Sequence, residues 1–335
     1  IISNLETSYY ECVFNILEGT ASDTPEIKKL RLATGENLYV RQQATVPLTL
    51  LAANMYAIKN KDETPFHFGK VNRERTEKLI FRMLEENKDY PRVLEYLVNV
   101  VDRLRNANEK WAEIILKTFI FKPNSISYQP DYVLHNIVPL LIYFAEFRTN
   151  LGDAFNPGLF RSLLKRVIKE GKPPIRTTII WHFWKNVQET PVVFERLEKY
   201  IEGFFEPPFY EEIIGQLEFL AQEVFKIDSS KGIEIFESNL AYVERGLSEG
   251  ANPRDVWLSV DELIDQIAAK EPTHLLELVK RSSALIQRGL YIGDPKRIFN
   301  SYQKTPAEFQ ESIKKEYSVI VEQLKKTVPY FDVQL

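Results

Sequence analysis

The chain has 335 residues, of which 44% are hydrophobic and 27% are charged, so it carries enough apolar side chains for a folded core and is not disordered throughout. Its 13 glycines are few for an all-β fold, which needs glycine at many tight turns, and this scarcity favours helices. The formal net charge of −4 disfavours a protein whose main task is to grip nucleic acid, because such proteins usually carry an excess of cations.

Six helix starts are marked along the chain by a capping residue that is followed directly by proline. The capping side chain accepts a hydrogen bond from a free N–H group of the first helical turn, and proline fits the next position because its missing N–H is not needed there. These pairs are Thr24-Pro25, Asn156-Pro157, Thr190-Pro191, Asn252-Pro253, Asp294-Pro295 and Thr305-Pro306. At the last pair, Glu308 completes the pattern of a capping box.

Apolar residues recur at steps of three and four after these starts, as they do on one face of a helix. The residues from Phe309 to Leu324 are a clear example. The periodicity predicts an all-α protein of about sixteen helices. In chain order they lie near residues 5–19, 25–34, 38–59, 71–88, 91–105, 108–121, 130–149, 157–170, 174–188, 191–203, 208–226, 230–248, 253–270, 272–289, 295–303 and 306–327. Pro47 and Pro139 fall inside two of these helices, where each should bend the helix or mark a new start.

Short connections make consecutive predicted helices antiparallel neighbours. The segment 39–51 carries the pair Val40-Arg41, the small residue Ala44 and leucines beyond it, and it resembles the second helix of a HEAT-type repeat. The segment 174–183 resembles it less closely, because Ile179 stands where the small residue is expected. The resemblance implies an irregular α-solenoid of stacked antiparallel helical hairpins, similar to HEAT and armadillo repeat proteins. An ordinary amphipathic helix is the alternative interpretation of each segment.

No Ser/Gly-rich linker divides the chain, so we expect residues 1–335 to form one continuous helical-repeat region, with hinges near 122–130 and 203–210. The first residue is Ile1 rather than Met, so we expect the chain to be part of a longer protein, and whether an effector or enzymatic domain precedes it is open. Cys12 is the only cysteine, which excludes an internal disulfide and favours a reducing, cytoplasmic setting. The longest apolar run, residues 137–145, is far shorter than the ~20 residues of a membrane span, so we expect no membrane partner.

The chain contains no recognisable catalytic or cofactor-binding motif. Its four histidines lie too far apart for a helical metal pair, and phosphate-binding glycine loops and the GxSxG serine motif are absent. Asp261 and Asp265 lie one turn apart on a predicted helix, where they could share a divalent cation. This segment resembles the aspartate-rich motif of isoprenoid synthases, but the second motif that those enzymes carry on a facing helix is missing. We therefore expect no enzymatic activity, metal or cofactor, and an all-helical metal-dependent enzyme is kept as an alternative.

A run of cations forms the first candidate binding site. It consists of Arg161, Lys165, Arg166, Lys169, Lys172 and Arg176, against the single acid Glu170. Three of them, four residues apart, fall on one stripe of a helix, which could bind phosphate groups or an acidic partner. An ordinary solvent-exposed helix face is the first alternative. Pairing with the acidic segment that follows, residues 195–223, is the second.

A cluster of aromatic residues around a Pro-Pro pair forms the second candidate site. Its members are Phe204, Phe205, Phe209 and Tyr210. If they are exposed, they form an apolar patch suited to a protein partner, and if they are buried, they fill the joint between stacked hairpins. The run from Trp181 to Trp184 is predicted to be core, because four consecutive large residues spread over several faces of a buried helix.

We expect this chain to be a non-enzymatic protein-interaction scaffold or recognition region built from helical repeats. Its partner would be another protein or another domain of the same protein, bound through the two candidate sites. One alternative is a nucleic-acid-binding HEAT-like protein that uses the basic stripe at 161–176, which the acidic net charge disfavours. The other alternative is the metal-dependent enzyme that uses Asp261 and Asp265.

Overall fold

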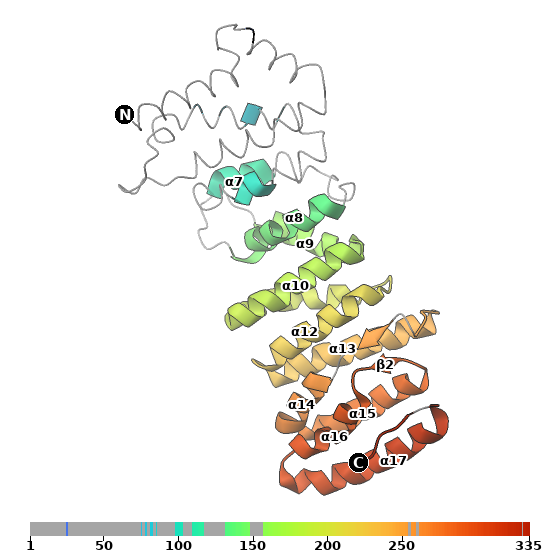
Figure 1. The fold of residues 1–335 in the computed structure, drawn as a ribbon. Coiled ribbons are helices and arrows are strands. Elements are labelled where there is room, and N and C mark those ends of the chain that lie inside the picture. The colour runs from blue at the N-terminus through green and yellow to red at the C-terminus, as the bar shows by residue number, and fades with distance from the viewer. Residues whose placement is uncertain are drawn as a thin grey trace. The chain divides into compact units, whose positions relative to one another are not determined.

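The computed structural model describes residues 98–102, 109–116, 131–147, 157–253, 256–258, 261–329 and 331–335, together with single helical residues before them. The chain divides into two compact units, Ile1–Arg148 and Thr149–Leu335. The regular elements of the described residues are helices apart from two strands of two residues each, so the all-α prediction is confirmed (Figure 1). The predictions made for Cys12, for the segment 39–51 and for a hinge near 122–130 lie outside the described residues.

The described part of the first unit is helical. It contains a helical segment at 98–102, then α7 (Glu109–Ile115), α8 (Asp131–Ile142) and the π-helical turn η3 (Tyr143–Phe147). α8 continues through Pro139, although proline cannot donate to the helical ladder. The wider π-helical turn begins four residues after this proline. Around Pro139 the side chains of Val138 and Leu140 are buried, so the packing of this segment holds the helix together despite the missing bond.

The second unit holds most of the described elements. Its α-helices are α9 (Pro157–Glu170), α10 (Pro173–Glu189), α11 (Phe194–Leu197), α12 (Ile214–Phe225), α13 (Ser229–Ser248), α14 (Asp261–Lys270), α15 (Pro272–Gln287), α16 (Pro295–Asn300) and α17 (Ala307–Thr327). Its 3₁₀-helices are η4 (Pro191–Val193), η5 (Glu198–Phe205), η6 (Glu211–Ile213) and η7 (Ser301–Lys304). Its strands are β1 (Trp257–Leu258) and β2 (Tyr291–Ile292), which pair in parallel with Leu258 opposite Ile292.

Side-chain caps mark the starts of α13 and α16, at Asp228 and Asp294, whereas the side chain of Thr190, predicted to cap the helix start at Pro191, makes no capping hydrogen bond. The carboxylate of Asp294 accepts a hydrogen bond from the backbone N–H of Lys296 at 3.0 Å, as its position before Pro295 predicts. The capping box predicted at Thr305 is wrong. Its hydroxyl donates instead to the carbonyl oxygen of Tyr302 in the preceding 3₁₀-helix, and α17 begins without a side-chain cap. Proline there still ends one element and begins the next.

The helix predicted at 253–270 is also wrong in its first half. Asn252-Pro253 lies in a turn, and the helix begins only at Asp261. The reason is burial with a period of two: Val256 and Leu258 are both buried, which suits an extended segment rather than a helix. Leu258 then pairs with the strand that follows α15.

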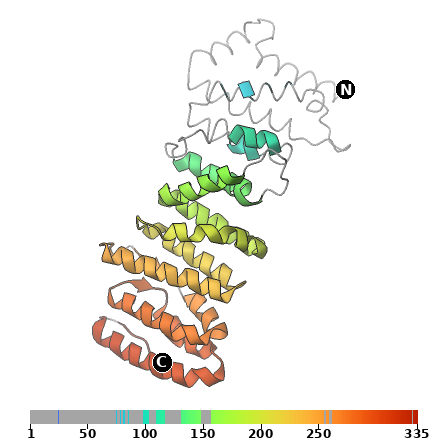
Figure 2. The ribbon, with the colours of Figure 1, turned by 180° about the vertical axis from the view of Figure 1, so that it is seen from behind.

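When Phe194–Phe205 is counted as one helix, every second helix in chain order contacts the next one of its series. The helices of the second unit therefore form two rows. The first row runs α10, α12, α14 and α16, and the second runs α9, η5, α13, α15 and α17. Consecutive helices join the rows, as α12 does with α13 and α14 with α15. Figures 1 and 2 show these helices following one another in chain order from both sides. Each helix therefore packs mainly on its nearest neighbours in the chain.

A polar link joins each pair of neighbours in the first row. Between α10 and α12, the indole N–H of Trp184 donates to Gln216 at 2.8 Å. Between α12 and α14, the side-chain amide of Gln222 donates to Glu262 at 2.7 Å. Between α14 and α16, Nε of Arg297 lies 3.2 Å from a carboxylate oxygen of Asp265.

Ion pairs join neighbours at the first three steps of the second row. Lys169 of α9 pairs with Glu206 at the end of η5 at 3.0 Å, and Glu198 at the start of η5 pairs with Lys231 of α13 at 2.8 Å. Glu244 of α13 pairs with Arg281 of α15 at 3.3 Å. Pairs of this exposure are worth only about 0–1 kcal/mol each, so the buried apolar faces supply the stability and the pairs fix the register between helices.

Candidate interaction surface

The end of η5 is capped by two arginines from other helices. The last carbonyl groups of a helix lack helical N–H partners, and they form the negative end of its dipole. Nη2 of Arg176, on α10, donates to the carbonyl oxygens of Gly203 and Phe204. Nη2 of Arg245, on α13, donates to the carbonyl oxygen of Phe205 at 2.7 Å. The end of η5 is thus held from both rows.

Arg176 is fully buried, so it cannot belong to an exposed basic surface. Its guanidinium carbon lies 5.2 Å from the centre of the Tyr210 ring, in the geometry of a cation–π contact. Burial lowers the pKa of Arg176 below its ordinary value, because desolvation penalises the charged form. The structure therefore places this candidate residue among the contacts that hold the fold.

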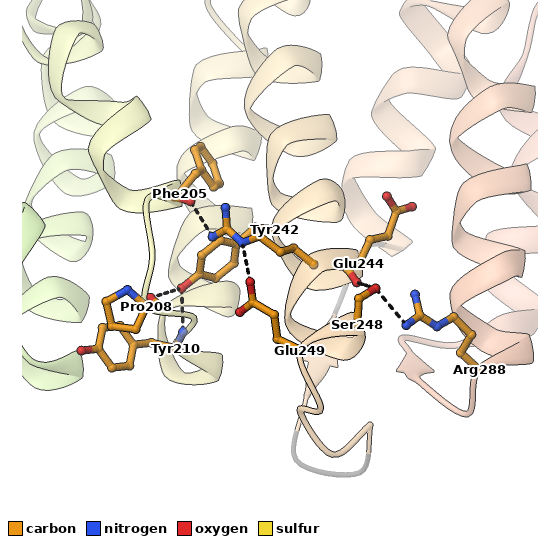
Figure 3. A network of polar contacts seen from close by, with 9 residues as sticks. Phe205, Pro208, Tyr210, Tyr242, Glu244, Ser248, Glu249 and Arg288 are labelled. Carbon is orange, nitrogen blue, oxygen red and sulfur yellow. Dashed lines mark hydrogen bonds and ion pairs between the residues drawn. The ribbon is translucent and has the colours of Figure 1, made fainter.

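Tyr242 of α13 fixes the loop after η5. Its hydroxyl accepts a hydrogen bond from the backbone N–H of Tyr210 at 2.6 Å and donates to the carbonyl oxygen of Pro208 at 3.4 Å (Figure 3). The peptide bond between Pro207 and Pro208 is cis. Burial raises the pKa of Tyr242, because the phenolate would be poorly solvated there. The loop thus has hydrogen bonds to α13 at both of its ends, and the hinge predicted near 203–210 stays a prediction.

The aromatic cluster of this loop packs inward. Phe204 is fully buried with its ring centre 5.7 Å from that of Phe183. Phe205 and Phe209 are half-buried, with ring centres 6.0 and 4.9 Å from that of Tyr242. Of the two alternatives for the aromatic cluster, the buried one, in which the rings fill the joint between helices, describes where these residues lie. They leave little of an apolar surface for a partner.

Four of the other five cations of the run lie on the surface. Arg161, Lys165, Lys169 and Lys172 are exposed, whereas Arg166 is half-buried and pairs with Glu170. Lys169 pairs with Glu206 of the acidic segment 195–223. This contact agrees with the alternative in which the cations pair with that segment. The pairing is incomplete, because Glu198 of the same segment binds Lys231 of α13 instead.

The structure describes the side chain of only one carboxylate of the α14 pair, Asp265. Asp265 is engaged by Arg297, and the structure describes Asp261 only as the first residue of the helix. Within the described residues, no group of three or more His, Cys, Asp or Glu side chains is placed to hold a metal ion.

An exposed aromatic patch was missed by the sequence prediction. We define the aromatic patch as Trp181 and Trp184 of α10 with Phe219 of α12. Trp181 is 41% exposed and Phe219 is 50% exposed, and the half-buried Trp184 lies between them. Its ring centre is 6.0 Å from that of Trp181 and 5.7 Å from that of Phe219. The core prediction for the run 181–184 is therefore wrong for Trp181 and correct for the buried Phe183.

A helical-wheel argument could have found this patch. The buried face of α10 contains Ile175, Ile179 and Phe183, spaced by four residues. Trp181 lies two residues from both Ile179 and Phe183, which is about 200° around the helix, and so falls on the opposite face. Four consecutive aromatic-type residues cover most of the circumference of a helix, so at least one of them must point away from a one-sided core.

Two ion pairs are formed by charged residues that lie close to the aromatic patch in the sequence. Lys185 pairs with Glu189 at 3.5 Å, and Glu223 pairs with Lys226 at 2.6 Å. At Gly215, one turn before Phe219, an added Cβ would meet no atom within 4 Å, so the surface there is open. The surface is thus open one turn before Phe219, and the lysines Lys185 and Lys226 near the patch are paired.

Comparison of the chain with protein-family models, with curated proteins and with solved structures found no match. Across the part of the chain that the structure describes, no helix has the length and apolar character needed to cross a membrane. Among the exposed side chains of the second unit, the aromatic patch is the most distinctive grouping.

Proposed function

We propose that this chain is a protein-interaction scaffold built as an irregular HEAT-like α-solenoid of about sixteen helices. The two rows of the second unit support the solenoid, because the extensive contacts among its described helices are between near neighbours in the chain. Such arrays present extended surfaces that bind partners without any catalytic group. Architecture alone does not establish a scaffold function, so the proposal also needs a binding site on the surface.

The aromatic patch is the observation that carries the proposal. Large exposed aromatic side chains are costly in water, and Trp and Phe that gather on a surface are typical of protein–protein contacts. Trp181 and Phe219 come from different helices of the same row and both contact or approach Trp184, so the array builds the patch rather than one helix alone. The partner would cover these rings with apolar groups of its own.

A protein partner suits this patch better than a nucleic acid. Single-stranded nucleic acid also stacks on aromatic rings, but it needs a cationic groove beside them. Lys185, which follows Trp184 in the sequence, and Lys226, seven residues after Phe219, already have acidic partners. The basic stripe is also weakened as a phosphate site, since Arg176 is buried and Lys169 is paired.

Affinity capture with a double variant tests the proposal. The Trp181→Ala/Phe219→Ala protein and the wild type would be used as baits in extracts of the native cells, with recovery measured by quantitative mass spectrometry. Central aromatic residues of an interface contribute about 2 kcal/mol or more each to binding. The recovery of at least one specific partner by the double variant should therefore be about thirtyfold or more below its recovery by the wild type.

A matched control removes exposed apolar side chains elsewhere. Val192 and Val319 are 76% and 61% exposed and lie outside the patch. The Val192→Ala/Val319→Ala protein should retain the same partners as the wild type. If the patch variant also retains every specific partner at wild-type level while its circular dichroism is unchanged, the aromatic patch is not the binding surface.

A further inference from the structure

Ser248 stands at the end of α13 among arginines. Its side chain is exposed, and its hydroxyl donates to the carbonyl oxygen of Glu244 at 2.8 Å. The same oxygen accepts a hydrogen bond from Nη2 of Arg288, just beyond α15, at 3.5 Å (Figure 3). Arg245 precedes Ser248 by three residues, in the sequence Arg-Gly-Leu-Ser.

We propose that Ser248 is a phosphorylation site for a serine/threonine kinase that selects a basic residue three positions before its acceptor, and that Arg288 holds the phosphate. Kinases of this class read their substrates through charge patterns, with acidic side chains that bind the basic residue. The hydroxyl oxygen of Ser248 attacks the γ-phosphorus of ATP, and the bond from this phosphorus to the β–γ bridging oxygen breaks. ADP leaves, and the hydroxyl proton passes to the catalytic base of the kinase.

Exposure distinguishes Ser248 from other serines near cations. Ser282 and Ser283 directly follow Lys280 and Arg281, so their local charge pattern is also basic. They are only 1% and 4% exposed, because they lie on the buried face of α15. A folded chain therefore offers Ser248 and hides these two.

The surroundings of Ser248 decide what a phosphate there would do. A phosphoserine carries nearly two negative charges at neutral pH, and the carbonyl end of α13 and the neighbouring Glu249 repel it. Arg288 offsets this repulsion. Its guanidinium already contacts the Ser248 hydroxyl, and a phosphate oxygen would replace a weak neutral contact by a charge-assisted one.

The last turn of α13 must open for the kinase to bind it in an extended form. That opening uncovers the half-buried Leu247 and the buried backbone of Gly246, against which the ring of Phe209 packs. Arg245 must leave the carbonyl oxygen of Phe205 and its ion pair with Glu249, which measures 3.8 Å. Such local opening at a helix end costs far less than global unfolding.

Incubation of the whole chain with ATP and a purified arginine-directed kinase, the catalytic subunit of cyclic-AMP-dependent protein kinase, tests the acceptor. Mass spectrometry should place the phosphate on Ser248, and Ser248→Ala should reduce incorporation about tenfold or more. A peptide of residues 240–252 is the positive control. If the peptide is phosphorylated and the whole protein is not, Ser248 is not a phosphorylation site of the folded chain. If the peptide is not phosphorylated either, the assignment of the kinase class is wrong.

A second measurement tests Arg288 and separates recognition from consequence. Phosphorylation should lower the melting temperature of the Arg288→Gln protein more than that of the wild type, by a difference of about 2–4 °C. The reason is that only the repulsive neighbours remain in the variant. An equal shift in the two phosphorylated proteins shows that Arg288 does not hold the phosphate.

Discussion

At Arg176 the protein encloses a positive charge whose hydrogen bonds go to backbone carbonyl groups rather than to a carboxylate. Its Nε and Nη1 atoms are buried and have no hydrogen-bond acceptor among the described residues. Such burial is costly, and the offsetting contacts are the two carbonyl groups at the end of η5 and the face of the Tyr210 ring. The side chain therefore acts as a connector between α10 and the end of η5, two elements that are neighbours in the chain.

The Arg176→Met substitution measures this connection. Methionine keeps most of the volume of the side chain but leaves the carbonyl groups of Gly203 and Phe204 without their donor. We expect the free energy of unfolding to fall by about 2–3 kcal/mol, as read from urea denaturation. The control is Arg166→Met on α9, where an exposed pair with Glu170 at 3.0 Å is lost and the cost should be about 0.5 kcal/mol or less. Equal costs would mean that the buried guanidinium contributes no more than a surface charge.

At the scale of elements, most helices of the second unit could be predicted from the sequence. Periodicity and proline placed α9, α13, α15 and α17 to within two residues of their observed bounds. The sequence failed where tertiary contacts decided. The extended segment around Leu258 exists because a strand 34 residues later pairs with it, and no local pattern announces that partner.

The candidate site was less predictable than the fold, for a reason that Trp181 and Phe204 illustrate. Both are large aromatic residues in strongly apolar segments, and composition alone cannot tell which one faces solvent. Their burial depends on which neighbouring helix covers each face, and that is a property of the assembled rows. Only the angular position of Trp181 relative to the buried residues of α10 could have indicated that its side chain is exposed.

Two glycines test how closely α12 and α13 approach. A Cβ added at Gly232 of α13 would lie 2.5 Å from Cα and Cβ of Phe225, whereas one added at Gly215 of α12 would meet nothing within 4 Å. Alanine is the better helix former, so Gly215→Ala should raise the free energy of unfolding by about 0.5–1 kcal/mol. Gly232→Ala should lower it by about 2 kcal/mol, since backbone at the helix joint must move. Urea denaturation of both variants decides, and a gain at Gly232 would show that the joint is looser than the structure places it.

At the scale of the second unit as a whole, contacts between near neighbours predict that stability is local. α17 packs on α15 and η7, and α10 packs on α9, η4, η6 and α12. Among the described elements, no extensive contact joins the α9–α10 end of this unit to α17. In an array of this kind, stability is close to a sum over neighbouring steps, whereas a single globular core would lose its protection everywhere at once.

Hydrogen exchange on two variants distinguishes these behaviours. Leu324 of α17 and Phe183 of α10 are both fully buried, and truncating either to alanine should cost about 2–5 kcal/mol locally. In a solenoid, Leu324→Ala should speed amide exchange in α15 and α17 while leaving α9 and α10 at wild-type rates, and Phe183→Ala should give the reverse pattern. Uniform acceleration across the unit in both variants would contradict the solenoid. It would leave the aromatic patch as a feature of an ordinary helical domain, because the rings of Trp184 and Phe219 need only α10 and α12 to meet.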